Sequence, residues 1–144
     1  MPEKDTEQLE NELSESDDVK KFLDENADNL RDFTFAEYLK RLLCAKNLSR
    51  KQIIDDSCVG SGYGPHIFSG RNIPSREKVI LLALAMKLSP EETNYLLYYA
   101  GHEKLYARNS WDAIIRFALE KNKTVDETNQ LLADSGMKLL PIRP

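Results

Sequence analysis

Cysteine and histidine are scarce in this sequence, with two of each among 144 residues. Cys44 and Cys58 have no zinc-type spacing, and two histidines are too few to complete a ligand set with them. We therefore expect no metal site, no cofactor and two free thiols, which is typical of a cytoplasmic protein.

Long hydrophobic runs are also missing. The longest unbroken apolar run extends from Val79 to Met86, which is far too short to cross a bilayer. The amino terminus has no basic segment followed by an apolar one, so we expect no export signal. These absences predict a cytoplasmic protein with no membrane partner.

The sequence has no catalytic motif. His66 and His102 have no nucleophile or carboxylate motif beside them. The letters GSGYG at residues 60–64 resemble a phosphate loop, but no strand is expected before them and no Lys-Ser or Lys-Thr pair follows. We therefore expect that the protein is not an enzyme.

Acidic residues are concentrated at the start of the chain. Residues 1–32 hold twelve acidic and four basic residues, a net charge of −8, whereas residues 33–78 hold eight basic and four acidic ones. Residues 1–16 are predicted to be a disordered acidic leader, and residues 17–32 a leader helix from about Asp17 to Asn29. The leader either only solvates or competes with a polyanion for the basic segment. If the leader competes, deleting residues 1–16 should tighten non-specific DNA binding at low salt. If the leader only solvates, the deletion should leave that affinity unchanged.

The rest of the chain predicts an all-α fold. Thr34 with Glu37 and Ser49 with Gln52 have capping-box spacing, and Ser75 is a further helix cap. Apolar residues at helical spacing follow each of the first two caps. The domain expected from these helices covers residues 33–105.

A repeat of 35 residues occupies the second half of the chain. Residues 77–105 align with residues 112–140 without a gap, and ten positions are identical. Each copy has the pattern of a helix, a short turn, a second helix and a glycine stop. We expect two stacked αα-hairpins, the first (77–105) inside the domain and the second over residues 106–144. The surface of the repeats over residues 77–140 is a possible site for a protein partner.

Residues 48–75 resemble the helix-turn-helix of the Cro/repressor (XRE-type) DNA-binding family. The resemblance lies in Leu48-Ser49, Ile53-Ile54, Ser57-Cys58-Val59-Gly60, Ile67, Gly70-Arg71 and Pro74-Ser75. It is closer to a branch of regulators from Gram-positive bacteria, through residues 35–39, 66–71, 74–78, 105–109 and 127–129, and covers roughly residues 17–144.

The resemblance implies a five-helix-type Cro/repressor domain that binds double-stranded DNA, as a homodimer. The residues it places against DNA phosphates are Ser49, Arg50, Lys51, Arg71, Asn72 and Arg76. The residues it places toward base edges, in the first turns of the recognition helix, are Ser61, Gly62, Tyr63 and His66.

The recognition segment departs from that pattern in five positions. Cys58 and Gly60 replace the usual turn glycine and cap serine, and Gly62 and Gly64 offer no side chain to a base. Pro65 is tolerated only in the first helical turn, so we expect the regular helix to begin there, after an irregular loop. Two functions stay open: a DNA-binding transcriptional regulator, or a degenerate helix-turn-helix that serves as a protein-interaction adaptor.

An aromatic cluster lies in and after the first repeat. Its members are Tyr95, Tyr98, Tyr99, Tyr106 and Trp111. Helical spacing within the cluster favours packing inside the hairpins over a ligand pocket. A dimer face is the alternative, because aromatic side chains are enriched at interfaces.

Overall fold

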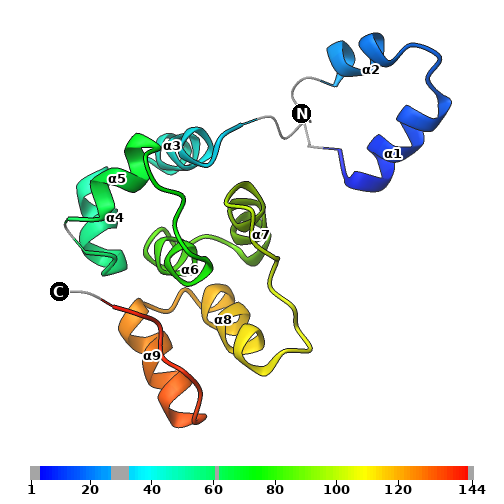
Figure 1. The fold of residues 1–144 in the computed structure, drawn as a ribbon. Coiled ribbons are helices and arrows are strands. Elements are labelled where there is room, and N and C mark those ends of the chain that lie inside the picture. Colours follow the sequence, from blue (N-terminus) through cyan, green and yellow to red (C-terminus); the bar gives the residue numbers. More distant parts are fainter. Residues whose placement is uncertain (1–3, 27–32, 61, 143–144) are drawn as a thin grey trace. The chain divides into compact units, whose positions relative to one another are not determined.

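The computed structural model describes residues 4–26, 33–60 and 62–142. In these residues the chain forms nine α-helices and no strand, so the prediction of an all-α protein is confirmed (Figure 1). The chain divides into two compact units, residues 1–32 and residues 33–144, and each is described by itself.

The first unit contains helices where the sequence predicted disorder. α1 spans Thr6–Glu15 and begins with a full capping box, in which Asp5 and Gln8 bond each other's backbone N–H groups at 2.8 and 2.9 Å. Lys4 adds a bond to Glu12 and one of 2.8 Å to Asn26. The expectation of disorder over residues 1–16 is therefore wrong for residues 6–15, because it weighed composition and missed the cap.

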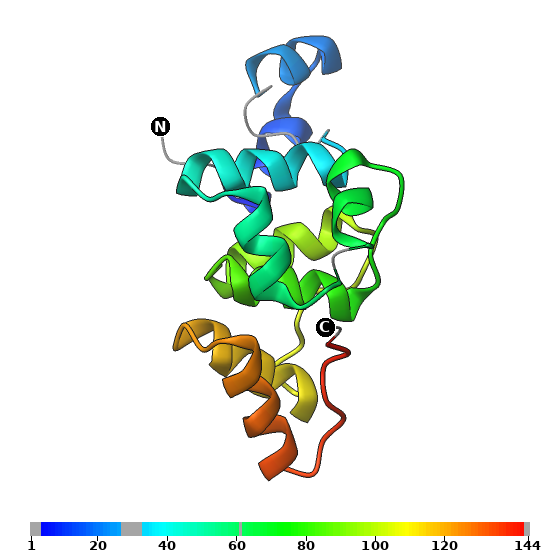
Figure 2. The same cartoon turned by 90° about the vertical axis from the view of Figure 1, so that its left-hand side faces the viewer.

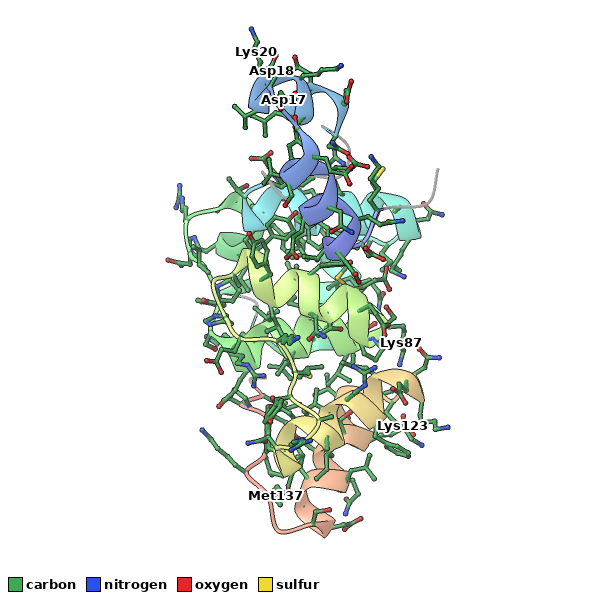
Figure 3. All side chains as sticks on the ribbon, turned by 90° about the vertical axis from the view of Figure 1, so that its right-hand side faces the viewer. Asp17, Asp18, Lys20, Lys87, Lys123 and Met137 are labelled. Atoms are coloured by element: carbon green, nitrogen blue, oxygen red, sulfur yellow. The ribbon has the colours of Figure 1, made fainter. Side chains whose placement is uncertain are left out.

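The leader helix is shorter than predicted within the described residues. α2 spans Val19–Glu25, and the carboxylate of Asp18 accepts hydrogen bonds from the backbone of Lys20 and Lys21 (Figure 3). Residues 27–32, which include the predicted end near Asn29, lie outside the described part of the chain.

The second unit begins with α3, Phe35–Lys46, and α4, Arg50–Ser57. Thr34 and Ser49 cap these helices, accepting from the backbone N–H of Glu37 and Gln52 at 3.2 and 3.0 Å. Neither cap is a full box, because Glu37 bonds the Thr34 hydroxyl and Gln52 donates to Asp56 instead. α5, Gly64–Ser69, follows α4 and packs on α3.

α6, Arg76–Ala85, is the central helix of this unit. Ser75 caps it, and its residues 79–84 are all buried. It contacts α4, α7, α8 and α9, so that α6 lies between α4 and α7 on one side and the last two helices on the other (Figure 1). A helix that is apolar all round is stable in water only when it is covered on every side.

The two hairpins share local structure at positions 35 residues apart. α7 spans Pro90–Tyr99 and α9 spans Val125–Asp134, and each begins with a full capping box: Ser89 with Glu92, and Thr124 with Glu127. The amide oxygen of Asn94 accepts from the backbone N–H of Leu105 at 2.8 Å. That of Asn129 accepts in the same way from Leu140 at 2.7 Å, so one asparagine in each hairpin holds the segment that follows it.

The turns between the helices of each hairpin lie against each other. Lys87 and Asn122, one in each turn, both have a left-handed backbone. The Lys87 ammonium donates to the backbone oxygen of Asn122 at 3.1 Å, and Lys87 and Lys123 lie along the same edge of the unit (Figure 3). This bond joins the first hairpin to the second.

α8, Ser110–Glu120, and the turn after it are more polar than α6 and the turn after that helix. The positions that correspond to the buried residues Leu81, Met86 and Leu88 hold Arg116, Lys121 and Lys123. A terminal repeat needs a polar outer face, because no further repeat covers it. Phe117, with 46% of its surface exposed, is the exception on this face.

Candidate nucleic-acid interface

The amino terminus of α4 presents two basic side chains. Ser49 is occupied as the cap, and its hydroxyl oxygen accepts from the backbone N–H of Gln52. Arg50 and Lys51 are exposed, and the Arg50 guanidinium carbon lies 5.2 Å from the centre of the Phe68 ring. Because Phe68 is fully buried in α5, this stacking places one cation over the junction of the two helices.

The turn after α4 requires a left-handed backbone. Cys58 ends the helix with φ of 59°, and Gly60 follows with φ of 102°. Residues other than glycine are strained in this backbone region, so Cys58 lowers the stability of the fold relative to a glycine at the same position. Burial raises the pKa of the Cys58 thiol, and the carboxylates of Asp126 and Asp56 raise it further, so the thiol stays protonated at neutral pH.

α5 begins one residue earlier than expected. Tyr63 precedes it without a side-chain cap, and the carbonyl oxygen of Gly60 accepts instead from the backbone N–H of Tyr63 and Gly64. Pro65 lies in the first turn, where its missing N–H needs no partner, and its side chain is exposed. The helix has six residues, which is less than two turns.

Gly64 is a packing residue. It is buried, and a Cβ atom built on it would lie 2.6 Å from Cγ2 of Ile54. α4 and α5 therefore approach too closely at this point for any side chain. The sequence pattern indicated that Gly64 lacks a side chain for a base contact. In the structure this residue faces α4.

The four residues expected to face bases have different environments. Ser61 lies outside the described residues, and Gly62 is exposed with no atom within 4 Å of where its Cβ would be. Tyr63 is half-buried against the core, and the Lys78 ammonium lies 3.6 Å from the centre of its ring. His66 is half-buried.

Lys78 was missed by the sequence reasoning as part of this site. It lies in the first turn of α6, fifteen positions after the ring it covers, and no local spacing rule links the two. The basic charge of residues 33–78 was the only signal that pointed to it.

Arg71 and Asn72 lie directly after α5. Gly70 ends the helix with φ of 81°, and the backbone N–H of Arg71 bonds the carbonyl oxygen of His66 at 3.2 Å. Both side chains are exposed. The exposed cations therefore lie at the two ends of the α4–α5 pair, Arg50 and Lys51 at its start and Arg71 after its end. Figure 2 shows the ribbons of α4 and α5, in green, facing the viewer.

Arg76 corrects the predicted set of phosphate contacts. Its guanidinium binds both carboxylate oxygens of Asp112 at 3.0 and 2.8 Å, and donates to the backbone oxygens of Glu103 and Lys104 at 3.1 Å each. Asp112 also accepts from the backbone N–H of Tyr106 at 2.9 Å. Arg76 is thus committed to joining α6 to α8, and it is not available for a phosphate.

An acidic cleft lies away from these cations. It measures about 440 Å³ and lies between the end of α4, the end of α6 and the start of α9. Its charged lining is mostly acidic: Asp55, Asp56 and Asp126, with Lys87. Carboxylates repel phosphate, so this cleft does not belong to a nucleic-acid surface.

The second histidine and the aromatic cluster take structural and exposed positions. A ring nitrogen of His102 lies 2.8 Å from the backbone oxygen of Pro74, and the Trp111 indole donates to the backbone oxygen of Lys138 at 2.8 Å. Tyr99 is half-buried and stacks with Tyr38 at 4.6 Å between ring centres. Tyr98 and Tyr106 are exposed, so only part of the cluster packs inside the hairpins.

No protein-family model matches the sequence, and no curated protein and no solved structure matches it either. Among the residues that the structure describes, no helix is long and apolar enough to span a bilayer. No group of three histidine, cysteine or acidic side chains within the same residues is arranged to hold a metal ion.

Proposed function

We propose that the protein is a DNA-binding transcriptional regulator, with α4 and α5 as the helix-turn-helix of a Cro/repressor-type domain built from α3 to α7. The second hairpin, α8 and α9, extends this domain as a duplicate of α6 and α7. The protein acts as a homodimer on double-stranded DNA, as helix-turn-helix domains commonly do.

The exposed cations around the α4–α5 pair are the observation that carries this proposal. Arg50, Lys51 and Arg71 form no ion pair with any described residue, whereas Lys46, Arg76, Arg116 and Lys138 do. Exposed cations without an ion pair at the two ends of one helix pair suit the phosphates of a duplex, because backbone charge supplies much of the affinity for DNA.

Binding to duplex DNA tests the proposal through matched variants. Replacing Lys51 and Arg71 with alanine should weaken the affinity at 0.1 M salt by at least about tenfold, since two phosphate contacts are lost. Lys121→Ala removes an exposed cation of α8 and should leave the affinity unchanged. Equal losses in the two variants, or no binding by the unaltered protein, would reject this function.

A protein-interaction adaptor is the second candidate, and the shortness of α5 favours it. With six residues, α5 offers little surface to a groove, and the exposed rings of Tyr98 and Tyr106 offer apolar area to a partner. A stoichiometric protein partner that remains bound to the variant with Arg50→Ala and Arg71→Ala would support the adaptor. Recovery of DNA alone would count against it.

A further inference from the structure

We propose that the α4–α5 site recognises duplex DNA through its sugar–phosphate backbone, with little discrimination among base sequences. This inference rests on the proposed function and specifies which part of the duplex the site recognises. It is argued from the side chains at the amino-terminal end of α5, which is the end that meets base edges in a helix-turn-helix.

Three positions at this end provide no hydrogen-bonding side chain. Gly64 has no free space, because α4 approaches it at Ile54. Pro65 is exposed but carries neither a donor nor an acceptor on its side chain. Gly62 has open space around it and simply lacks a side chain.

Tyr63 is held on the domain. Its ring packs against the hydrophobic core, and the Lys78 ammonium lies over the ring face at 3.6 Å. A close cation is attracted to the face of an aromatic ring, and both the core contact and this one would be lost if the ring turned toward a groove. Tyr63 and Lys78 therefore act as a pair that steadies the start of α5.

Apart from Tyr63, whose ring is held on the domain, His66 is the described residue at this end whose side chain can offer a hydrogen bond to a base. An imidazole edge makes a single hydrogen bond, whereas strong discrimination comes from bidentate arginine, asparagine or glutamine contacts. The cations Arg50, Lys51 and Arg71 supply attraction that does not depend on sequence. Little preference among sequences is therefore expected from this site.

The test compares sequences at fixed salt with the full chain. Duplexes are enriched from a random pool by repeated binding, and the affinity for the best duplex is compared with that for a scrambled duplex of the same length and composition. The ratio should stay below about tenfold, and a larger ratio would overturn the inference while leaving DNA binding intact, since specific regulators exceed about 1,000-fold. Absence of binding to either duplex at low salt would instead reject the proposed function, and this inference with it.

A variant that gains a base contact provides the complementary test. Gly62→Gln places a bidentate amide where the structure leaves space, so the same selection should give a discrimination ratio at least about tenfold above that of the unaltered protein. Ala133→Gln, at an exposed position on α9, is the control and should give no gain. A Gly62→Gln protein that keeps its melting temperature and its DNA affinity but gains no discrimination would contradict the inference.

Discussion

The guanidinium of Arg76 joins three segments of the second unit: α6, the loop at residues 103–106 and α8. Its partner Asp112 has a side chain that is only 9% exposed, and a carboxylate so placed needs a paired cation. The sequence resemblance assigned Arg76 to DNA because it follows the Pro-Ser pair of the motif. In the structure this basic residue of the motif instead joins α6 to α8 through Asp112.

Replacing Arg76 with alanine should lower the free energy of unfolding by about 3 kcal/mol, because it leaves the Asp112 carboxylate without its cation. Urea denaturation measures this loss. Arg108→Ala, at an exposed position before α8, is the control and should change stability by less than about 0.5 kcal/mol. Unchanged stability together with weaker DNA binding would restore Arg76 to the phosphate contacts.

The two glycines around Tyr63 should respond oppositely to an added methyl group. Gly64→Ala forces a Cβ against Ile54 and should cost about 1–3 kcal/mol of unfolding free energy, as overpacking does. Gly62→Ala meets open space, so it should be neutral or should stabilise the fold by up to about 1 kcal/mol. The gain comes from the lower conformational entropy of the unfolded chain. Thermal denaturation of both variants decides this, and equal effects would refute the close approach of α4 and α5.

The helices of the second unit were largely predictable because their signals are local. The caps at Thr34, Ser49 and Ser75 each lie three residues from the backbone group they bond, and the structure contains all three. The bond between Arg76 and Asp112 and the contact of Gly64 with Ile54 join residues far apart in the chain. Such contacts leave no periodic pattern in a single sequence, so the site could be predicted only in part.

The glutamates of the two capping boxes make the hairpins sensitive to acid. The bond from the backbone N–H of Thr124 holds the pKa of Glu127 below its usual range, with the Thr124 hydroxyl adding to it. At Glu92, burial raises the pKa, but the Ser89 backbone bond and the Lys46 ammonium together lower it by more. A carboxyl with a lowered pKa in the folded state stabilises the fold above its unfolded pKa, and this contribution is lost as pH falls.

Glu127→Gln should therefore melt below the unaltered protein at pH 7, and the two melting temperatures should converge between about pH 5 and pH 3. Glutamine keeps an acceptor for the cap but does not titrate, so the change isolates the charge. Glu103→Gln, outside any cap, should melt like the unaltered protein at both ends of this range. A constant difference across the range would show that the Glu127 charge has no part in the cap.

The whole molecule combines an acidic first unit with a second unit of net charge +4. A net charge of −8 over residues 1–32 opposes DNA binding only where this unit comes within a Debye length of the duplex, which is about 30 Å at about 0.01 M salt. In the second unit, α6 is covered by α4 and α7 and by α8 and α9. The rings of Tyr98 and Tyr106 are exposed on this unit.

A homodimer should have about twice the 16.5 kDa mass of the chain in sedimentation equilibrium. If the aromatic residues form the dimer face, Tyr98→Ser should shift the distribution toward the monomer, because a central exposed aromatic ring contributes much of an interface's affinity. Gln130→Ser, an exposed position on α9, is the matched control. A single 16.5 kDa species at about 100 µM, well above typical dissociation constants, would exclude the dimer.

The dependence of duplex-DNA affinity on salt tests the central claim most directly. With Arg50, Lys51 and Arg71 on phosphates, the logarithm of the binding constant should fall with the logarithm of salt concentration at a slope of about −2.7 per protomer, and at about −0.9 when Lys51 and Arg71 are alanine. A slope near zero for the unaltered protein, or the same slope in both proteins, would contradict DNA binding at the α4–α5 site.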